Sequence, residues 1–265
     1  MKRRLQHLFL TLVLLLCGTA AFAQGKVYTR KARLEDFPTR TTKVVLAGNS
    51  FMELALREEV AVHWRISPYE FCSPEEYAAL RSSNNYYFLT LAQQEGIAYL
   101  ILTKGGREDE TESLRKPFEV VRIPIASVDD PSGRELLFMG AFLDILQAFV
   151  EEAIVSDKTA YAGLAAVNNG KLTGKRVYLD PDAADEAFAR QERNALVGIT
   201  IAPVQITFRS VCYKMLVSAD THELFYFDKG RYKGPNDARF TDAEAKRFDR
   251  RGAILVEAGA ISSGI

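Results

Sequence analysis

The chain has 265 residues, with 34 basic and 34 acidic side chains, so its formal net charge is zero. With 48% hydrophobic and 26% charged residues it has the composition of a globular protein, which excludes a collagen-like, low-complexity or wholly disordered chain. Nucleic-acid-binding proteins usually carry a basic footprint, so the balanced charge gives no reason to expect a nucleic-acid partner. The length is sufficient for one large domain or two small ones.

Residues 1–23 have the three parts of a cleaved secretory signal. Basic residues 2–4 precede an apolar stretch at 8–16, and Ala-Phe-Ala at 21–23 is a small-x-small cleavage site that would leave Gln24 first. The apolar stretch is shorter than the roughly 20 residues of a membrane-spanning helix. We therefore expect export to the periplasm or the extracellular space by a cleaved signal peptide.

Cleavage would remove three basic and no acidic residues from a balanced total, so the mature net charge would be −3. Two cysteines, Cys72 and Cys212, and two histidines, His63 and His222, remain. An oxidising compartment permits a Cys72–Cys212 disulfide, and two buried thiols are the alternative, because spacing alone cannot place the two Cα atoms. These four residues are far apart or isolated, so their spacing predicts no metal site, and no cofactor motif is present.

The mature chain is expected to have three parts. A basic arm at 24–42 is followed by an α/β core at 43–165 and by a C-terminal α+β part at 166–265, in the same domain or a second one. The looser stretch at 156–174 is the candidate boundary. The arm is expected to be solvated, with a peripheral contact to acidic lipid headgroups as the alternative.

The first half of the core alternates between strand and helix patterns. Met52, Leu56 and Val60 recur at four-residue spacing, which is typical of one helix face. The predicted elements, in chain order, are a strand at 43–47, a helix at 50–62, an extended segment at 64–69, a short helix after Ser73, strands at 86–91 and 97–103, a charged loop at 105–116 and a strand at 118–125.

Residues 134–154 predict the most apolar helix of the mature chain, and between 136 and 150 only Asp144 and Gln147 are polar. A helix that is apolar nearly all round is buried in the protein or embedded in a membrane, and this one is expected to pack on the sheet. The later predicted elements are a strand at 175–179, a helix at 181–192, a hairpin of 211–217 with 223–228, and a helix at 241–250.

These patterns together predict an α/β fold. We expect a mixed sheet with an N-terminal βαβαβ-like unit, antiparallel additions and a long buried helix. At the level of fold only, this order of elements is similar to envelope α/β modules such as the N-terminal domain of TolB. No motif residues accompany that likeness, so it transfers no site.

Gly48-Asn49-Ser50 follows the first predicted strand and resembles the serine block of SGNH-type hydrolases, and residues 234–237 (Gly-Pro-Asn-Asp) resemble that family's Gly-x-Asn-Asp block. The resemblance implies a periplasmic serine hydrolase. Ser50 would be the nucleophile, His222 the base, Asp220 the residue that orients the imidazole, and Asn236 an oxyanion donor.

The same residues have structural explanations. Residues 50–53 (Ser-Phe-Met-Glu) form a capping box that would start the helix, as do 73–76 and 241–244. Asp220 and His222 belong to a predicted hairpin turn, and they precede the Asn236 block, whereas the family's Asp and His follow it. The favoured interpretation is therefore a non-enzymatic binding or envelope-assembly factor with an envelope protein partner, and the alternatives are the Ser50 hydrolase and a periplasmic small-ligand binder.

Overall fold

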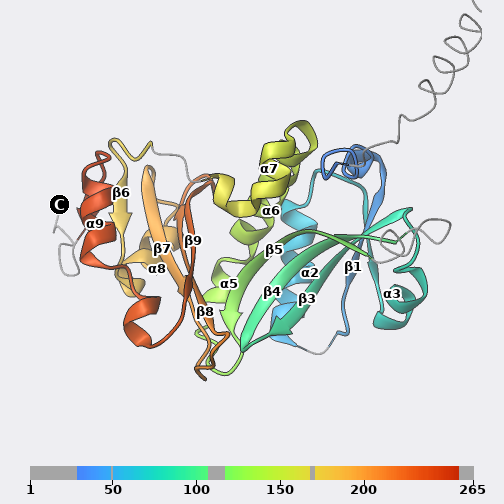
Figure 1. Ribbon diagram of the computed structural model, residues 1–265, viewed down its shortest axis with the longest axis horizontal. Helices are drawn as coiled ribbons and strands as arrows, with labels where there is room; N and C mark the ends of the chain where they lie inside the picture. The colour runs from blue at the N-terminus through green and yellow to red at the C-terminus, as the bar shows by residue number, and fades with distance from the viewer. Residues whose placement is uncertain (1–28, 49, 107–116, 168–170, 257–265) are drawn as a thin grey trace, which may run out of the picture.

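The computed structural model describes residues 29–48, 50–106, 117–167 and 171–256. Its strands form two five-stranded sheets that lie side by side in Figure 1. The first sheet has the strand order β2-β1-β3-β4-β5 and the second has β10-β6-β7-β8-β9. The predicted α/β class is confirmed, with the strands divided between two mixed sheets.

In the first sheet, β1 pairs parallel with β2 and β3, while β3, β4 and β5 pair antiparallel in sequence order. Helices α2 and α3 connect the three parallel strands, as the βαβαβ pattern predicts. The bounds of these elements are β1 Thr41–Val45, α2 Phe51–His63, β2 Tyr69–Cys72, α3 Pro74–Leu80, β3 Tyr86–Gln94, β4 Ile97–Lys104 and β5 Phe118–Ser127.

The second sheet repeats this pattern of strand directions. Strands β10, β6 and β7 are parallel, and β7, β8 and β9 pair antiparallel. The outer parallel strand of this sheet, β10, comes last in the chain, whereas its counterpart β2 comes second. The two sheets are therefore alike in strand directions and differ in the order in which the chain forms them. The bounds are β6 Arg176–Tyr178, α8 Pro181–Ala189, β7 Ala195–Ile201, β8 Val211–Ser218, β9 Leu224–Arg231, η3 Pro235–Ala238, α9 Asp242–Asp249 and β10 Ile254–Val256.

The predicted helix starts are confirmed by their caps. Ser50 and Thr241 each accept a hydrogen bond from the backbone of the glutamate three residues on, and that glutamate reaches back to the cap backbone. Ser73 caps α3 with Pro74 at its first position. Within the extended segment expected at 64–69, the strand β2 begins only at Tyr69, directly after Pro68, which has no N–H to donate to a strand neighbour.

Strand β7 is a central strand of the second sheet that the sequence patterns do not predict. Its residues (ALVGITI) are almost uniformly buried, so they lack the alternation of a half-exposed strand. Gly198 interrupts the apolar run for a packing reason. A Cβ at this position would lie 2.9 Å from the ring of Phe240 and 3.1 Å from the carbonyl oxygen of Tyr178.

The apolar helix predicted at 134–154 is confirmed as buried, although Phe138 divides it into α5 (Arg134–Leu137) and α6 (Met139–Val155). The stretch after it is more ordered than predicted. Ser156 caps a short helix, α7 (Asp157–Ala162), which continues into η2 (Gly163–Val167).

Buried side chains of both sheets and of α2, α6 and α8 form one continuous core, and a smaller cluster lies between the second sheet and α9. The described part of the N-terminal arm belongs to this core, since Leu34 and Phe37 are buried. Arg30 and Arg33 lie over the ring of Phe118, so residues 29–40 do not form a free arm. Among the described residues, none of the helices has the length and apolar character that crossing a membrane requires.

Candidate metal centre

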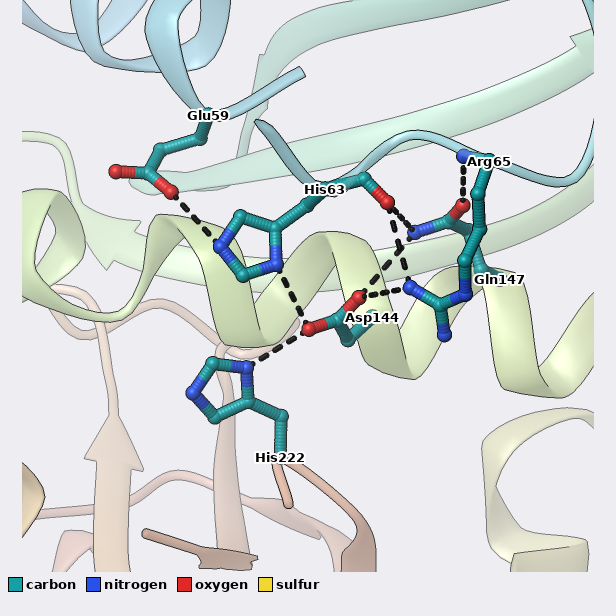
Figure 2. Close-up of polar contacts among 6 residues, drawn as sticks. All are labelled: Glu59, His63, Arg65, Asp144, Gln147 and His222. Carbon is teal, nitrogen blue, oxygen red and sulfur yellow. Dashed lines mark hydrogen bonds and ion pairs between the residues drawn. The ribbon is translucent and has the colours of Figure 1, made fainter. Parts of the chain in front are cut away.

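Helix α6 runs along the junction of the two sheets and carries Asp144 within its apolar run (Figure 1). Ionisable groups are rarely buried without partners, so an aspartate here must be compensated by its neighbours. Its Oδ2 atom lies 2.8 Å from Nδ1 of His63 and 2.8 Å from Nδ1 of His222 (Figure 2). One carboxylate oxygen thus joins the two histidines that would remain after signal cleavage.

His63 is the last residue of α2, which packs beside α6. Gln147, one turn after Asp144, holds the end of α2 in place because its amide group bonds to the backbone of both His63 and Arg65. Its amide Nε2 donates to the carbonyl oxygen of His63 at 2.9 Å, and its Oε1 accepts from the N–H of Arg65 at 2.8 Å. Asp144 and Gln147, the two polar residues in the apolar run of α6, therefore both contact His63.

His222 reaches the site from the turn between β8 and β9. Its backbone has a φ of 57°, in the left-handed region, where histidine is found more often than most residues. The N–H of His222 donates to the carbonyl of Ser218 at 3.0 Å, which closes the turn. Its ring stacks on Phe188 of α8 with 5.4 Å between centroids and an interplanar angle of 17°. The imidazole is thereby held in one orientation toward Asp144.

The second carboxylate oxygen of Asp144, Oδ1, accepts hydrogen bonds from residues other than the two histidines. Arg65 donates to Oδ1 at 2.7 Å, and Gln147 donates to it at 3.4 Å. Burial disfavours the charged form of Asp144, but hydrogen bonds from His222, Arg65 and His63 outweigh this effect and lower its pKa to about 2. Asp144 is therefore an anion at neutral pH, with Oδ2 directed at the two imidazoles.

A second carboxylate contacts the far side of His63. Oε2 of Glu59, one turn earlier in α2, lies 3.3 Å from Nε2 of His63. Gly140 of α6 makes room for this pair, since a Cβ there would lie 2.7 Å from both atoms. His63 thus has a carboxylate at each ring nitrogen. In the absence of another cation, it could donate to both only by carrying two protons.

The three facing atoms, Nδ1 of His63, Nδ1 of His222 and Oδ2 of Asp144, lie within 4.8 Å of one another and are partly buried. Bonds from zinc to such atoms are about 2.0–2.2 Å long, so adjacent ligands of a tetrahedral site lie about 3.3 Å apart. The nitrogen–oxygen separations of 2.8 Å would need to open by about half an ångström to admit the ion. Two imidazoles and one carboxylate form a donor set that suits divalent transition metals.

The structure does not assemble the serine triad that the hydrolase resemblance implies. Oγ of Ser50 pairs with Glu53 in the capping box, Asp220 accepts from Ser218 at 2.6 Å, and His222 pairs with Asp144 rather than with Asp220. Asn236 lies in η3, after β9. Of the four residues, His222 is the one that reaches the site described here.

Cys72 and Cys212 are free and buried, so the structure has the two thiols and not the disulfide. Cys72 ends β2 in the first sheet, whereas Cys212 lies in β8 of the second, where its thiol faces the carbonyl oxygen of Asp237 at 3.3 Å. Burial raises the pKa of both thiols, which makes them poor nucleophiles and poor metal ligands.

Neither a protein-family model, nor a curated protein, nor a solved structure matches this chain. Conclusions about function therefore have to come from the geometry of the site. Sequence spacing does not reveal this site, because its three residues come from distant segments. The one indication in the sequence is Asp144, an acidic residue in an otherwise apolar helix. A buried carboxylate needs partners that are cationic or that can donate hydrogen bonds.

Proposed function

We propose that this chain is an exported, non-enzymatic binding protein whose ligand is a divalent transition-metal ion, with zinc as the first candidate. His63, Asp144 and His222 would supply the ligand atoms. The observation that carries the proposal is the convergence of both imidazole Nδ1 atoms on one oxygen of an ionised, partly buried aspartate.

Glu59 gives independent support. A metal-bound histidine usually donates its other ring N–H to a carboxylate, which fixes the tautomer and strengthens the ligand. Glu59 stands at that position on His63. With a metal ion at Nδ1, neutral His63 would donate its single proton from Nε2 to Glu59, and both nitrogens would be satisfied.

The position of Glu59 also favours binding over catalysis. Three protein ligands leave a coordination position for water or for a donor atom from a ligand. A hydrolytic site would also need a base beside that position. Glu59, the nearby carboxylate, is instead engaged on the side of His63 that faces away from Asp144 (Figure 2).

The test is calorimetric titration of the chelator-treated protein with zinc chloride. Wild type is expected to bind one equivalent, and the H63A, H222A and D144N variants should each weaken binding by at least tenfold. E186Q, which alters an exposed ion pair on α8, is the matched control and should bind as wild type does. Wild-type stoichiometry below one half, or equal affinity in all variants, would refute the proposal.

Export is the second part of the proposal and rests on residues 1–23, which lie outside the described residues. N-terminal sequencing of the protein recovered from its native host tests it directly. The expected mature terminus is Gln24. Retention of Met1 in the cell-associated protein would contradict export by signal cleavage.

An envelope protein partner remains a proposal of its own, and exposed apolar side chains between β7 and β8 favour it. Val204, Ile206 and Phe208 are exposed there, and Phe208 is 76% exposed. Cross-linking in cells, followed by purification and mass spectrometry, should recover a stoichiometric envelope partner. F208S should reduce that recovery, whereas V155S, at an exposed site on α6, should not. Equal recovery with both variants would exclude this loop.

A further inference from the structure

A second site lies apart from the three proposed metal ligands, in a cavity of about 390 Å³ between the two sheets. The cavity opens where β5 and β7 end, and α5 and the start of α6 form another of its walls. Its size falls in the range of small-molecule pockets. Much of its wall is apolar, with contributions from Ile125, Phe138, Phe142, Ile199 and Ile201.

The cavity wall contains a buried carboxylate that has no cationic partner. Glu135 is only 6% exposed, yet it forms no ion pair with any residue in the described part of the chain. Its contacts are hydrogen bonds from the N–H of Gly133 at 3.2 Å and from the hydroxyl of Ser132 at 3.5 Å. Buried glutamates are almost always paired, because the loss of hydration is otherwise uncompensated.

The adjacent arginine does not supply that missing charge. Nε of Arg134 lies 2.7 and 3.0 Å from the two carboxylate oxygens of Asp185, and Nη2 of Arg134 donates to the carbonyl oxygen of Gly198. The guanidinium also lies over the ring of Phe138. Arg134 and Asp185 therefore form a neutral pair, and Asp130 adds a second acidic side chain to the lining of the cavity.

Ser127, at the end of β5, lines the same cavity, and its hydroxyl oxygen is buried without a hydrogen-bond partner. Buried polar atoms are nearly always hydrogen-bonded, so each exception needs an explanation. This hydroxyl oxygen is shielded from the cavity, so Glu135 is the polar group on which binding of a ligand there would depend.

We propose that this cavity binds a small organic ammonium ion with an apolar body. The ammonium group would donate to the carboxylate of Glu135, and the hydrocarbon part would lie against Phe138, Phe142 and the isoleucines. An ammonium ion has several donors and no acceptor, which matches a carboxylate. An anionic or a neutral ligand would leave the buried charge of Glu135 uncompensated.

The test compares amines with alcohols of matched shape. Butylamine, cyclohexylamine, benzylamine and 2-phenylethylamine, as hydrochlorides, are titrated calorimetrically into full-length mature protein in the presence of EDTA, beside the corresponding alcohols and benzoate. The chelator removes any contribution from a metal ion elsewhere. At least one amine should bind more than tenfold more tightly than its alcohol, and benzoate should not bind.

The variant E135Q should lower the affinity for that amine at least tenfold, whereas E151Q, on an exposed position of α6, should leave it unchanged. If no amine exceeds its alcohol, or if E135Q binds the amine as wild type does, the proposal is wrong. Should E135Q fail to fold, as judged by its circular dichroism, the wild-type comparison of amine with alcohol decides the question alone.

Discussion

The imidazole rings of His63 and His222 lie 5.6 Å apart, centroid to centroid, although His63 ends a helix beside the first sheet and His222 lies in a turn of the second. Asp144 stands between them, with one oxygen 2.8 Å from each Nδ1 atom. The site therefore spans both halves of the molecule, and any ion bound there would connect them.

Glu59 should strengthen the metal site without contacting the ion. E59Q replaces the carboxylate at Nε2 of His63 by an uncharged amide, whose NH₂ group cannot accept a hydrogen bond. Loss of such a supporting carboxylate is expected to weaken zinc binding by about 10–100-fold. Calorimetric titration measures the change, with E58Q on the exposed side of α2 as control. Equal zinc affinity in E59Q and wild type would show that Glu59 does not support the site.

Gly140 should behave unlike an ordinary helix glycine. Replacement of glycine by alanine within a helix normally stabilises by about 0.5–1 kcal/mol. Here the added Cβ would lie 2.7 Å from Oε2 of Glu59 and from Nε2 of His63, so these side chains must move and G140A should gain less stability than that, or none. Because the added methyl group would push Glu59 and His63 apart, zinc affinity should fall as we expect it to fall in E59Q. Urea denaturation and calorimetry check the two effects separately, and a G140A variant with the full stabilisation and normal zinc affinity would contradict the packing described here.

The second sheet should contribute an acid-sensitive ion pair. Lys214 and Glu244 lie 2.8 Å apart with little exposure. Burial opposes ionisation of Glu244, but hydrogen bonds from Lys214 and Thr241 outweigh it, so the pKa of this carboxyl lies below its ordinary value of 4.5. A lowered carboxyl pKa contributes stability at neutral pH, and that contribution is lost as the pH falls below about 4.5.

E244Q preserves the capping geometry at Thr241 while it removes the charge, which leaves Lys214 buried and unpaired. At pH 7 the variant should lose about 3–5 kcal/mol of unfolding free energy. The difference between wild type and E244Q, measured by urea denaturation, should shrink as the pH is lowered from about 5 to about 3. A difference that stays constant across this range would show that the pair does not titrate as described.

Ser50 should act as a helix cap and not as a nucleophile. S50A removes the hydroxyl that accepts from Glu53 at 3.2 Å, and loss of such a cap costs about 0.5–2 kcal/mol of unfolding free energy. Thermal or urea unfolding measures this loss. Wild-type protein should show no labelling by a fluorophosphonate probe, and labelling that disappears in S50A would revive the hydrolase interpretation.

Much of the fold could be predicted from local signals. Ser50, Ser73 and Thr241 mark helix starts through residues three positions away, and the apolar run at 134–154 indicates a buried helix wherever it packs. Strand β7 could not be found in this way, because burial on both faces removes the alternation that identifies a strand. The division into two sheets is likewise set by contacts between distant segments.

The candidate site was predictable only in part. The sequence marks Asp144 and Gln147 as polar exceptions in an apolar helix, and both belong to the site. It does not indicate which residues compensate them. His63 has a local explanation at a helix end, and His222 has one in a turn, so neither pattern points to the other. Their meeting depends on how α6 packs against both sheets.

The most direct measurement is a crystal structure of the zinc-soaked protein, with anomalous diffraction recorded on both sides of the zinc absorption edge. The account predicts one strong anomalous peak about 2.0–2.2 Å from Nδ1 of His63, Oδ2 of Asp144 and Nδ1 of His222. Absence of a peak there, with the two imidazoles still hydrogen-bonded to Asp144, would contradict it.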